Sequence, residues 1–274
     1  FLYTNTDKLG ITLNLETALG VKVFKELVKH ADVLVENNAP GIMDKLGVGY
    51  ETLKQVNSSL IMTSITPFGQ TGPYRDFKTT DLITFHMSGY GYVTPGGGVD
   101  DPDKEGPLKA GGRQSEFASG LTAAVATMFA FLARKRTGLS QYVDVSMLES
   151  MHCLSLGPTA GYLYNGKAPN RMKYGMLGSL ANLPAKDGYV CVGLFDEGQW
   201  LRWVEVMGTP DWAKNDVFKD RLQRSANWDV IEPLMAEWSK DYTKEELTER
   251  GQSKRVPCLP INTTKDVLES RQLA

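Results

Sequence analysis

The sequence predicts an α/β protein built from a parallel sheet covered by helices, followed by a smaller α+β domain. Helical patterns alternate with short β-branched runs through the first half of the chain, and this alternation favours a parallel sheet. Those runs are continuously apolar, as is typical of strands buried on both faces. A stretch with few periodic apolar residues, 165–188, then reads as a linker.

Each expected element has a local reason. Residues 16–31 place Leu19, Val23, Phe24, Leu27 and Val28 on one helical stripe. The buried-strand runs and the opening extended segment predict strands at 10–15, 32–37, 59–65 and 141–147. Helices are expected over 40–57 (two short ones, with Pro40 suited to a first turn), 116–135 and 148–163.

The second half has its own alternation of elements. Strands are predicted at 188–194 and 256–261, and helices at 196–208, 226–242, 243–252 and 263–274. The first of these helices carries Trp200 and Trp203, and Thr243 with Glu246 forms a capping pattern. Between the predicted strand at 59–65 and the predicted helix at 116–135, the glycine- and proline-rich segments 66–81 and 88–107 predict loops. Their run PGGG at 95–98 is best interpreted as a flexible loop, because it does not connect a strand to a helix as a P-loop does.

Composition excludes several function classes. With 42% hydrophobic residues, 23% charged residues and a net charge of −2, the chain gives no electrostatic reason to expect nucleic acid or an anionic membrane as partner. No stretch approaches the roughly 18 apolar residues that a membrane span needs. Three scattered cysteines indicate neither a disulfide framework nor a metal site, and a reducing cytoplasmic setting is expected. The chain opens and closes inside structural patterns, so we expect it to be the middle of a longer protein.

Motifs for metal or nucleophilic catalysis are weak. His30, His86 and His152 are widely spaced and form no HxxxH or His/Cys cluster, so no metal site is predicted. No GxSxG nucleophile elbow occurs. Two carboxylates remain, Asp81 and Glu116, which each open a helical pattern and precede a Ser-Gly pair. On local physics alone, both are best interpreted as helix-start acids, worth about 0.3–1 kcal/mol each.

Several stretches taken together resemble the class III CoA-transferases, the group that includes formyl-CoA and crotonobetainyl-CoA:carnitine CoA-transferases (the CaiB/BaiF type). The matching stretches occur in the family's order over nearly the whole chain: "NTDKLGITLNLETALG", "LVKHADVLVENNAPGIMDKLGVGYETLKQVNSSLIMTSITPFGQTGPY", "DLITFHMSG", "EFASGLTAAVATMFAFLARKRTGLSQYVDVSMLES", "LPAKDGYVCVG" and "VPCLPINTTKDVLESRQLA". The family's N-terminal strand-helix segment and its C-terminal return to the large domain are missing from this sequence.

The resemblance implies a fold, an assembly and a substrate. It implies a partial Rossmann-like, CoA-binding large domain at 1–160, a linker at 161–180 and a small α+β domain at 181–274. It implies an interlocked ring-like dimer, formed with a second copy or with a homologous subunit. Coenzyme A enters as a substrate thioester, with an acyl-CoA and a carboxylic acid as partners and with no metal.

The resemblance also assigns the nucleophile. The family uses an aspartate in a D-x-x-x-G stretch, and aligning the Ser-Gly pairs places Glu116 at that position. Glutamate carries the same functional group, but its extra methylene displaces the carboxylate by about 1.5 Å, and a misplacement of about 1 Å can cost a hundredfold in rate. Two interpretations stay open: Glu116 is an active nucleophile, or the chain is the non-catalytic subunit of a heteromer whose partner keeps the aspartate.

The family's CoA loop is carried over residue by residue. It matches Asn37, Asn38, Pro40 and Gly41, followed by the basic and apolar pair Lys45 and Leu46; the resemblance adds Thr66. The loop lacks the family's usual aromatic residue at position 38, so its contact with adenine is an open point.

Racemase or dehydratase chemistry is the weaker alternative. Related racemases carry a histidine directly before the aspartate that matches Asp81, and here that position is Thr80. Glu197 is the residue that best matches the racemase's glutamate, although a helix-start role suits it equally. The acyl substrate is not specified. Four residues could line an acyl pocket, although such residues at this spacing are more often part of a core: Met87, Tyr90, Tyr92 and Met151.

Overall fold

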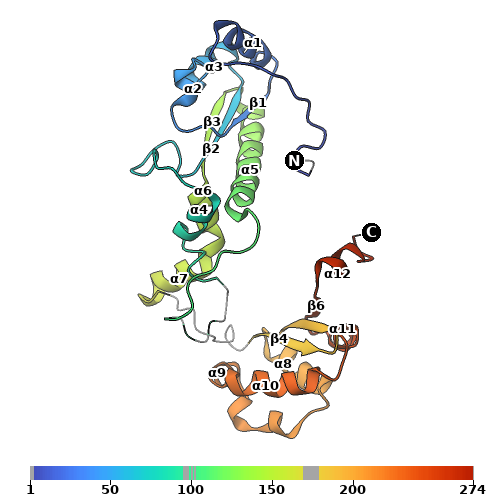
Figure 1. The fold of residues 1–274 in the computed structure, drawn as a ribbon. Coiled ribbons are helices and arrows are strands. Elements are labelled where there is room, and N and C mark those ends of the chain that lie inside the picture. The colour runs from blue at the N-terminus through green and yellow to red at the C-terminus, as the bar shows by residue number, and fades with distance from the viewer. Residues whose placement is uncertain (1–2, 95–98, 100, 102, 169–178, 274) are drawn as a thin grey trace. The chain divides into compact units, whose positions relative to one another are not determined.

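The computed structural model describes residues 3–94, 99, 101, 103–168 and 179–273 (Figure 1). The chain divides into two compact units, one of residues 1–94 and 107–169 and the other of residues 95–106 and 170–274. The first unit holds a parallel sheet and the second an antiparallel one, which confirms the predicted mixture of α/β and α+β parts. The loop 95–98 and much of the predicted linker at 161–180 lie outside the described residues.

The sheet of the first unit has the strand order β1-β2-β3, all parallel. The strands are β1 (Val33–Glu36), β2 (Ile61–Thr66) and β3 (Gln141–Ser146). The central strand β2 is buried almost throughout, as its continuous apolar pattern predicts. Glu36 pairs in register with Ser64, so β1 and β2 end at the same edge of the sheet.

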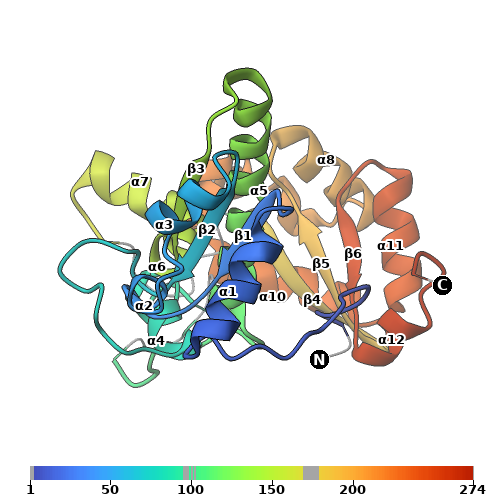
Figure 2. The ribbon, with the colours of Figure 1, turned by 90° about the horizontal axis from the view of Figure 1, so that it is seen from above.

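Helices α1 (Ala18–Val28), α2 (Ile42–Lys45) and α3 (Tyr50–Val56) pack on one face of this sheet, and α5 (Gln114–Thr137) packs on the other (Figures 1 and 2). The first unit also contains α4 (Asp81–Met87), α6 (Met147–His152) and α7 (Leu156–Asn165). Met62 of β2 belongs to the core under α1–α3, which includes Val28 and Leu53. The next side chain, Thr63, faces the opposite way and contacts Thr127 of α5, with 2.7 Å between the two hydroxyl oxygens. The alternation of side chains along β2 thus separates two helical layers.

Four expectations for the first unit need correction. No strand forms at 10–15: Ile11 is exposed, and the segment has no neighbouring strand to pair with. The stripe of α1 is only partly buried, because Val28 faces the core while Leu19 and Leu27 are exposed. The predicted helix over 148–163 is broken into α6, a short 3₁₀ turn and α7. Pro40 precedes Gly41, the residue that caps α2, rather than lying in the first turn.

Helix α5 also corrects the expectation that no stretch approaches a membrane span. Its 24 residues make it long and apolar enough to cross a membrane by length and composition alone, which is weak support for a span. In the structure one face of α5 packs against β2, β3, α4 and α6, and its buried residues are small: Ser115, Ser119, Ala123 and Ala130. The opposite face leaves large apolar side chains exposed: Leu121, Val125, Met128, Phe129 and Leu132.

The second unit contains the antiparallel sheet β4-β5-β6. Its strands are β4 (Leu180–Ala185), β5 (Gly188–Gly193) and β6 (Cys258–Ile261), and its helices are α8 (Glu197–Val206), α9 (Arg221–Ala226), α10 (Trp228–Ser239), α11 (Lys244–Ser253) and α12 (Thr264–Leu268). Strand β4 lies within the stretch 165–188 that the sequence interprets as a linker, which is a further correction. Pro184 and the short polar flanks hide the strand pattern, which pairing with β5 nevertheless stabilises.

Helices α8, α10 and α11 enclose the core of the second unit against this sheet. Trp200 and Trp203 of α8 are buried in it, as the amphipathic pattern predicts. Thr243 and Glu246 form a full capping box at the start of α11, so this sequence signal is confirmed.

Burial predicts the reactivity of the cysteines. Cys258 is fully buried beside α11, and burial, with a smaller contribution from Cys191, raises the pKa of its thiol to about 12. Because the thiolate is the reacting species, iodoacetamide at pH 8 should modify the exposed Cys153 and leave Cys258 intact until the protein is unfolded. Peptide mass spectrometry before and after urea treatment measures this. Modification of Cys258 in the folded protein at the rate of Cys153 would contradict the described packing.

Candidate active site at the start of helix α5

Glu116 lies in the first turn of α5, three residues after the N-cap Arg113. Its carboxylate is 44% exposed, and its ion pair joins it to the guanidinium of Arg113, with 3.0 Å between Nη1 and Oε2. Arg113 is itself largely exposed and supplies no side-chain cap to the helix. The glutamate is therefore accessible to a reactant.

Asp81, the other helix-start acid of the sequence, meets Glu116 through the backbone. It is the first residue of α4, yet its Oδ1 accepts hydrogen bonds from the amides of Ser115 (2.9 Å) and Glu116 (3.2 Å). The hydroxyl of Ser115 in turn donates to the carbonyl of Asp81 at 3.3 Å. The structure therefore joins the two residues that the sequence singled out separately, through the carboxylate of Asp81 and the backbone amide of Glu116.

A lysine that the sequence analysis missed completes this cluster. Nζ of Lys109 lies 2.9 Å from Oδ2 of Asp81, and the two side chains are only 21% and 11% exposed. The same ammonium donates to the carbonyls of Ala110 and Gly112, and it lies 5.5 Å from the ring centre of Phe85. A lysine in a glycine-rich loop carries no periodic signal, so only the fold shows that it faces Asp81.

The residues of the predicted CoA loop lie at the carboxyl edge of the sheet. Asn37 and Asn38 directly follow β1, and Oε2 of Glu36 accepts from both the backbone (2.7 Å) and side-chain (3.1 Å) nitrogens of Asn38. Gly41 adopts φ +80° as the N-cap of α2, and Pro40 precedes it. Lys45 and Leu46 end the same helix.

Thr66, the remaining predicted CoA residue, ends β2 at the same edge of the sheet. It is fully buried, and its hydroxyl oxygen has no hydrogen-bond partner within the part of the chain that the structure describes. Such an orphaned hydroxyl is unusual in a folded protein and is typical of a group that awaits a ligand or water.

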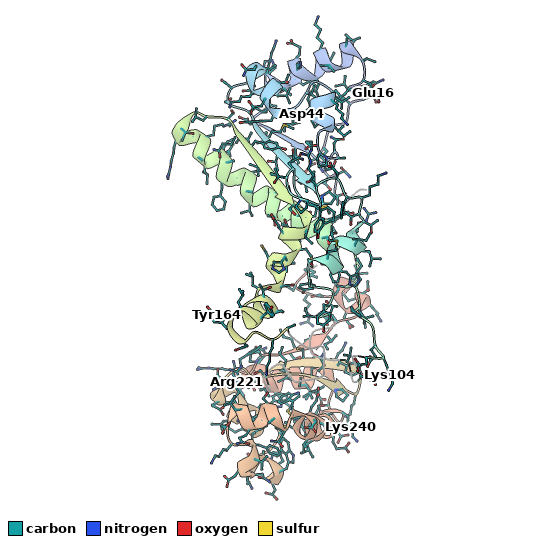
Figure 3. All side chains as sticks on the ribbon, turned by 90° about the vertical axis from the view of Figure 1, so that its left-hand side faces the viewer. Glu16, Asp44, Lys104, Tyr164, Arg221 and Lys240 are labelled. Carbon is teal, nitrogen blue, oxygen red and sulfur yellow. The ribbon has the colours of Figure 1, made fainter. Side chains whose placement is uncertain are left out.

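A cavity of about 320 Å³ opens between this edge and helices α2 and α3. Gly41 is the one predicted CoA residue among those that line it. Four others are next in sequence to a lining residue, namely Asn37, Asn38, Pro40 and Lys45. Carboxylates prevail among the charged groups of its wall, which is lined by Glu36, Ala39, Gly41, Met43, Asp44, Gly49, Tyr50, Glu51, Met62, Ser64, Gln70, Arg75 and Tyr142. Figure 3 labels Asp44, on α2 at the end of the unit that carries α1–α3.

Tyr142 and Arg75 are the lining residues that sequence reasoning missed. The hydroxyl of Tyr142 donates to Ser64 at 2.9 Å, and burial raises the pKa of Tyr142. Arg75 comes from the loop after β2, and its Nη2 lies 4.0 Å from the point that a Cβ on Gly41 would occupy. The dipeptide Tyr-Arg in a glycine- and proline-rich loop was the available signal for Arg75.

A second cavity of the first unit tests the candidate acyl pocket. It has a volume of about 350 Å³ and is lined by Ser88, Gly89, Tyr92, Val93, His152, Ser155, Pro158, Thr159, Tyr162 and Ala168. Of the four candidate residues Tyr92 lines it, whereas Met151 is buried in the core and Tyr90 packs against Phe85. Nδ1 of His152 lies 2.8 Å from the carbonyl oxygen of Ser88 in its wall.

The groups that racemase chemistry would require are engaged elsewhere. Thr80, at the position of the racemase histidine, is the N-cap residue of α4. Glu197 belongs to the second unit, where its carboxylate pairs with the buried Arg224 at 2.7 Å. Among the described residues, no three His, Cys, Asp or Glu side chains form a group that would hold a metal ion.

The first unit thus combines a parallel sheet with an accessible carboxylate at the start of its long helix. The family model of CoA-transferase family III matches residues 1–274, and the chain belongs to that family, a class of transferase enzymes.

Among curated relatives, the beta subunit of succinyl-CoA–L-malate CoA-transferase from Chloroflexus aurantiacus is 30% identical over 100% of this chain and 67% of its own length. Succinyl-CoA:mesaconate CoA-transferase from Haloarcula marismortui is 34% identical over 98% of this chain and 67% of its own length. A crystal structure of a CaiB/BaiF family protein from Brucella suis matches with a TM-score of 0.79 and 32% identity, covering 96% of this chain and 68% of that one. The chain thus spans about two thirds of the length of these proteins.

Proposed function

We propose that this protein transfers coenzyme A from an acyl-CoA thioester to a carboxylic acid, with Glu116 as the nucleophile. The observation that carries the proposal is the accessible carboxylate of Glu116 at the start of α5, in a chain of this family. The two curated relatives, from Chloroflexus aurantiacus and Haloarcula marismortui, carry succinyl-CoA in their names, so succinyl-CoA is the donor to test first.

The mechanism balances without a redox step or a net proton transfer. An oxygen of Glu116 attacks the thioester carbonyl carbon, the C–S bond breaks, and CoA thiolate leaves an acyl-glutamyl anhydride. The thiolate then attacks the carbonyl carbon of Glu116, the anhydride C–O bond breaks, and the donor acid departs as its carboxylate. The resulting glutamyl-CoA thioester is attacked by the acceptor carboxylate, and the same two steps run in reverse.

Coenzyme A binding is proposed for the carboxyl edge of the first sheet. The residues that would hold it are those carried over from the family pattern, namely Asn37, Asn38, Pro40, Gly41, Lys45, Leu46 and Thr66. The proposal is supported by where these residues lie, since ligands of open α/β sheets bind outside the carboxyl ends of the strands. On this proposal the first unit is the Rossmann-like, CoA-binding part of the enzyme, and the second unit is its small domain. We propose that the enzyme acts in the cytoplasm.

The direct test is to trap the enzyme-bound acyl group. The purified protein is incubated with succinyl-CoA, treated with hydroxylamine or borohydride, and digested for mass spectrometry. The proposal expects a hydroxamate or an alcohol at Glu116, because both the anhydride and the glutamyl-CoA thioester activate its carbonyl carbon. An unmodified Glu116 in a sample that turns over succinyl-CoA would overturn it.

A second assignment, the non-catalytic subunit of a heteromer, is favoured by two observations. The Chloroflexus relative is itself the beta subunit of an enzyme, and in this chain glutamate replaces the family's aspartate. Under this assignment the chain alone would bind acyl-CoA without turnover. Labelling would then fall only on a co-purified homologous subunit, an outcome that the trapping experiment distinguishes from the first assignment.

We further propose that the exposed apolar face of α5 is covered by the second subunit of an interlocked dimer. Leu121, Val125 and Phe129 recur on this face at four-residue spacing, and all are exposed in the single chain. Replacing Phe129 by Asp should therefore weaken association by at least about tenfold, since an interface core disfavours an unpaired charge. Sedimentation equilibrium measures this, with the exposed helix residue Glu26 changed to Gln as a control.

A further inference from the structure

Helix α5 begins without a cap of its own, although its first turn carries the proposed nucleophile. The first four amides of an α-helix have no intrahelical acceptor and need one from elsewhere. Arg113, at the N-cap position, provides no side-chain acceptor, and the amide of Phe117 donates to the carbonyl of Arg113. The amides of Ser115 and Glu116 instead donate to Asp81, which lies 34 and 35 residues away in sequence.

We propose that Asp81 is a positioning residue for Glu116. Because Oδ1 of Asp81 takes the amide of Glu116 itself, it fixes the backbone from which the reacting carboxylate extends. Its other oxygen pairs with Lys109, so a single carboxylate ties together the starts of α4 and α5 and the loop before α5. This inference rests on the proposed function, since positioning matters only where Glu116 reacts.

The burial and charge pairing of Asp81 distinguish this contact from a contact between exposed surface residues. The Asp81 side chain is 11% exposed, and a carboxylate at a helix N-terminus is favoured by the helix dipole. Lys109 neutralises that carboxylate and also donates to the backbone carbonyls of Ala110 and Gly112. The loop leading into α5 is therefore held through the same ammonium group.

The arrangement has a consequence for the chemistry. The amides of Ser115 and Glu116 point at Asp81 and are occupied by it, so they do not stabilise the oxyanion that forms when Glu116 attacks a thioester. Asp81 acts on the reaction through the position of Glu116 rather than through contact with the substrate. Positioning to within about 1 Å is worth roughly a hundredfold in rate.

Hydrogen exchange tests the contact itself, whether or not the protein is active. Asp81→Ala removes the acceptor, whereas Asp81→Asn keeps an accepting oxygen and asparagine caps helices as well as aspartate does. The amides of residues 115 and 116 should exchange roughly tenfold faster in the alanine variant and close to the wild-type rate in the asparagine variant. Glu26→Gln, which removes a carboxylate from an exposed ion pair of α1, is the matched control and should leave this exchange unchanged.

The rate at which succinyl-CoA acylates Glu116, followed by trapping and mass spectrometry, tests the functional part. Asp81→Ala should lower this rate about a hundredfold while changing the half-saturating succinyl-CoA concentration by less than about threefold, and Asp81→Asn should restore it to within about tenfold of wild type. A wild-type rate in the alanine variant, or an equal loss in both variants, overturns the inference. If Glu116 of the wild-type protein is never acylated, the proposed function is wrong. If the amides of residues 115 and 116 also exchange at the wild-type rate in Asp81→Ala, the positioning role of Asp81 is wrong as well.

Discussion

Replacing Glu116 by glutamine is expected to lower CoA transfer between succinyl-CoA and a carboxylic acid by at least about a thousandfold. The amide keeps the size of the side chain but has no anionic oxygen to attack the thioester. The measurement is the rate of appearance of the acceptor's CoA thioester, with mass spectrometry confirming that residue 116 carries no adduct.

A matched control separates the nucleophile from its ion pair. Arg113→Gln removes the same salt bridge but leaves the carboxylate, and because both partners are substantially exposed the rate should change by less than about tenfold. A glutamine variant that keeps most of the wild-type rate would show that another group carries the acyl chain. That result would contradict the assignment of Glu116.

Glu116→Asp distinguishes an adapted site from a vestigial one. If the pocket is built for glutamate, shortening the side chain by one methylene should lower the rate by about a hundredfold. If glutamate is a remnant of a lost aspartate site, the same change should create activity where the wild-type chain alone has none. The sign of the effect thus decides between the catalytic and the non-catalytic subunit.

The core strands of the first unit could be predicted from the sequence because their signal is local. Strands β1 to β3 are short apolar runs between helical patterns, and a parallel sheet buried on both faces needs that composition. Strand β4 was missed because Pro184 and the polar residues around it resemble a linker, and its stability comes from pairing with β5. Tertiary pairing of this kind leaves little trace in a single segment.

In the candidate site, too, local features could be predicted from the sequence and tertiary contacts could not. Asp81 and Glu116 are both detectable as helix-start acids, but each pattern alone predicts only a cap. Their contact depends on how α4 meets α5, and Lys109 reaches it from a loop without periodicity. The long helix α5 was predicted as a helix, while the exposure of its apolar face depends on which face packs against the sheet.

Arg224→Ala should destabilise the second unit by about 3–5 kcal/mol. Its side chain is 1% exposed, pairs with Glu197, donates to the carbonyl of Phe218 at 3.0 Å and lies 4.8 Å from the ring centre of Trp200. All five tryptophans fall within residues 200–238, so the urea midpoint measured by tryptophan fluorescence reports this unit.

The control for Arg224→Ala is the exposed pair Lys240–Glu237 of the same unit, with Lys240 on the surface in Figure 3. Lys240→Met should change the free energy of unfolding by less than about 1 kcal/mol, because both partners remain hydrated without each other. An Arg224→Ala variant with an equally small effect would mean that the buried contacts of Arg224 contribute little to the unit.

Two further variants separate the charge of Arg224 from its volume. Arg224→Met fills the space and leaves Glu197, which is 51% exposed and can be hydrated, so the main cost is the unpaired carbonyl of Phe218, about 1–3 kcal/mol. Glu197→Ala instead leaves a guanidinium buried without its carboxylate. Although Glu197 is the more exposed partner, its removal should cost more than Arg224→Met, because the penalty follows the charge that stays buried rather than the residue that is removed.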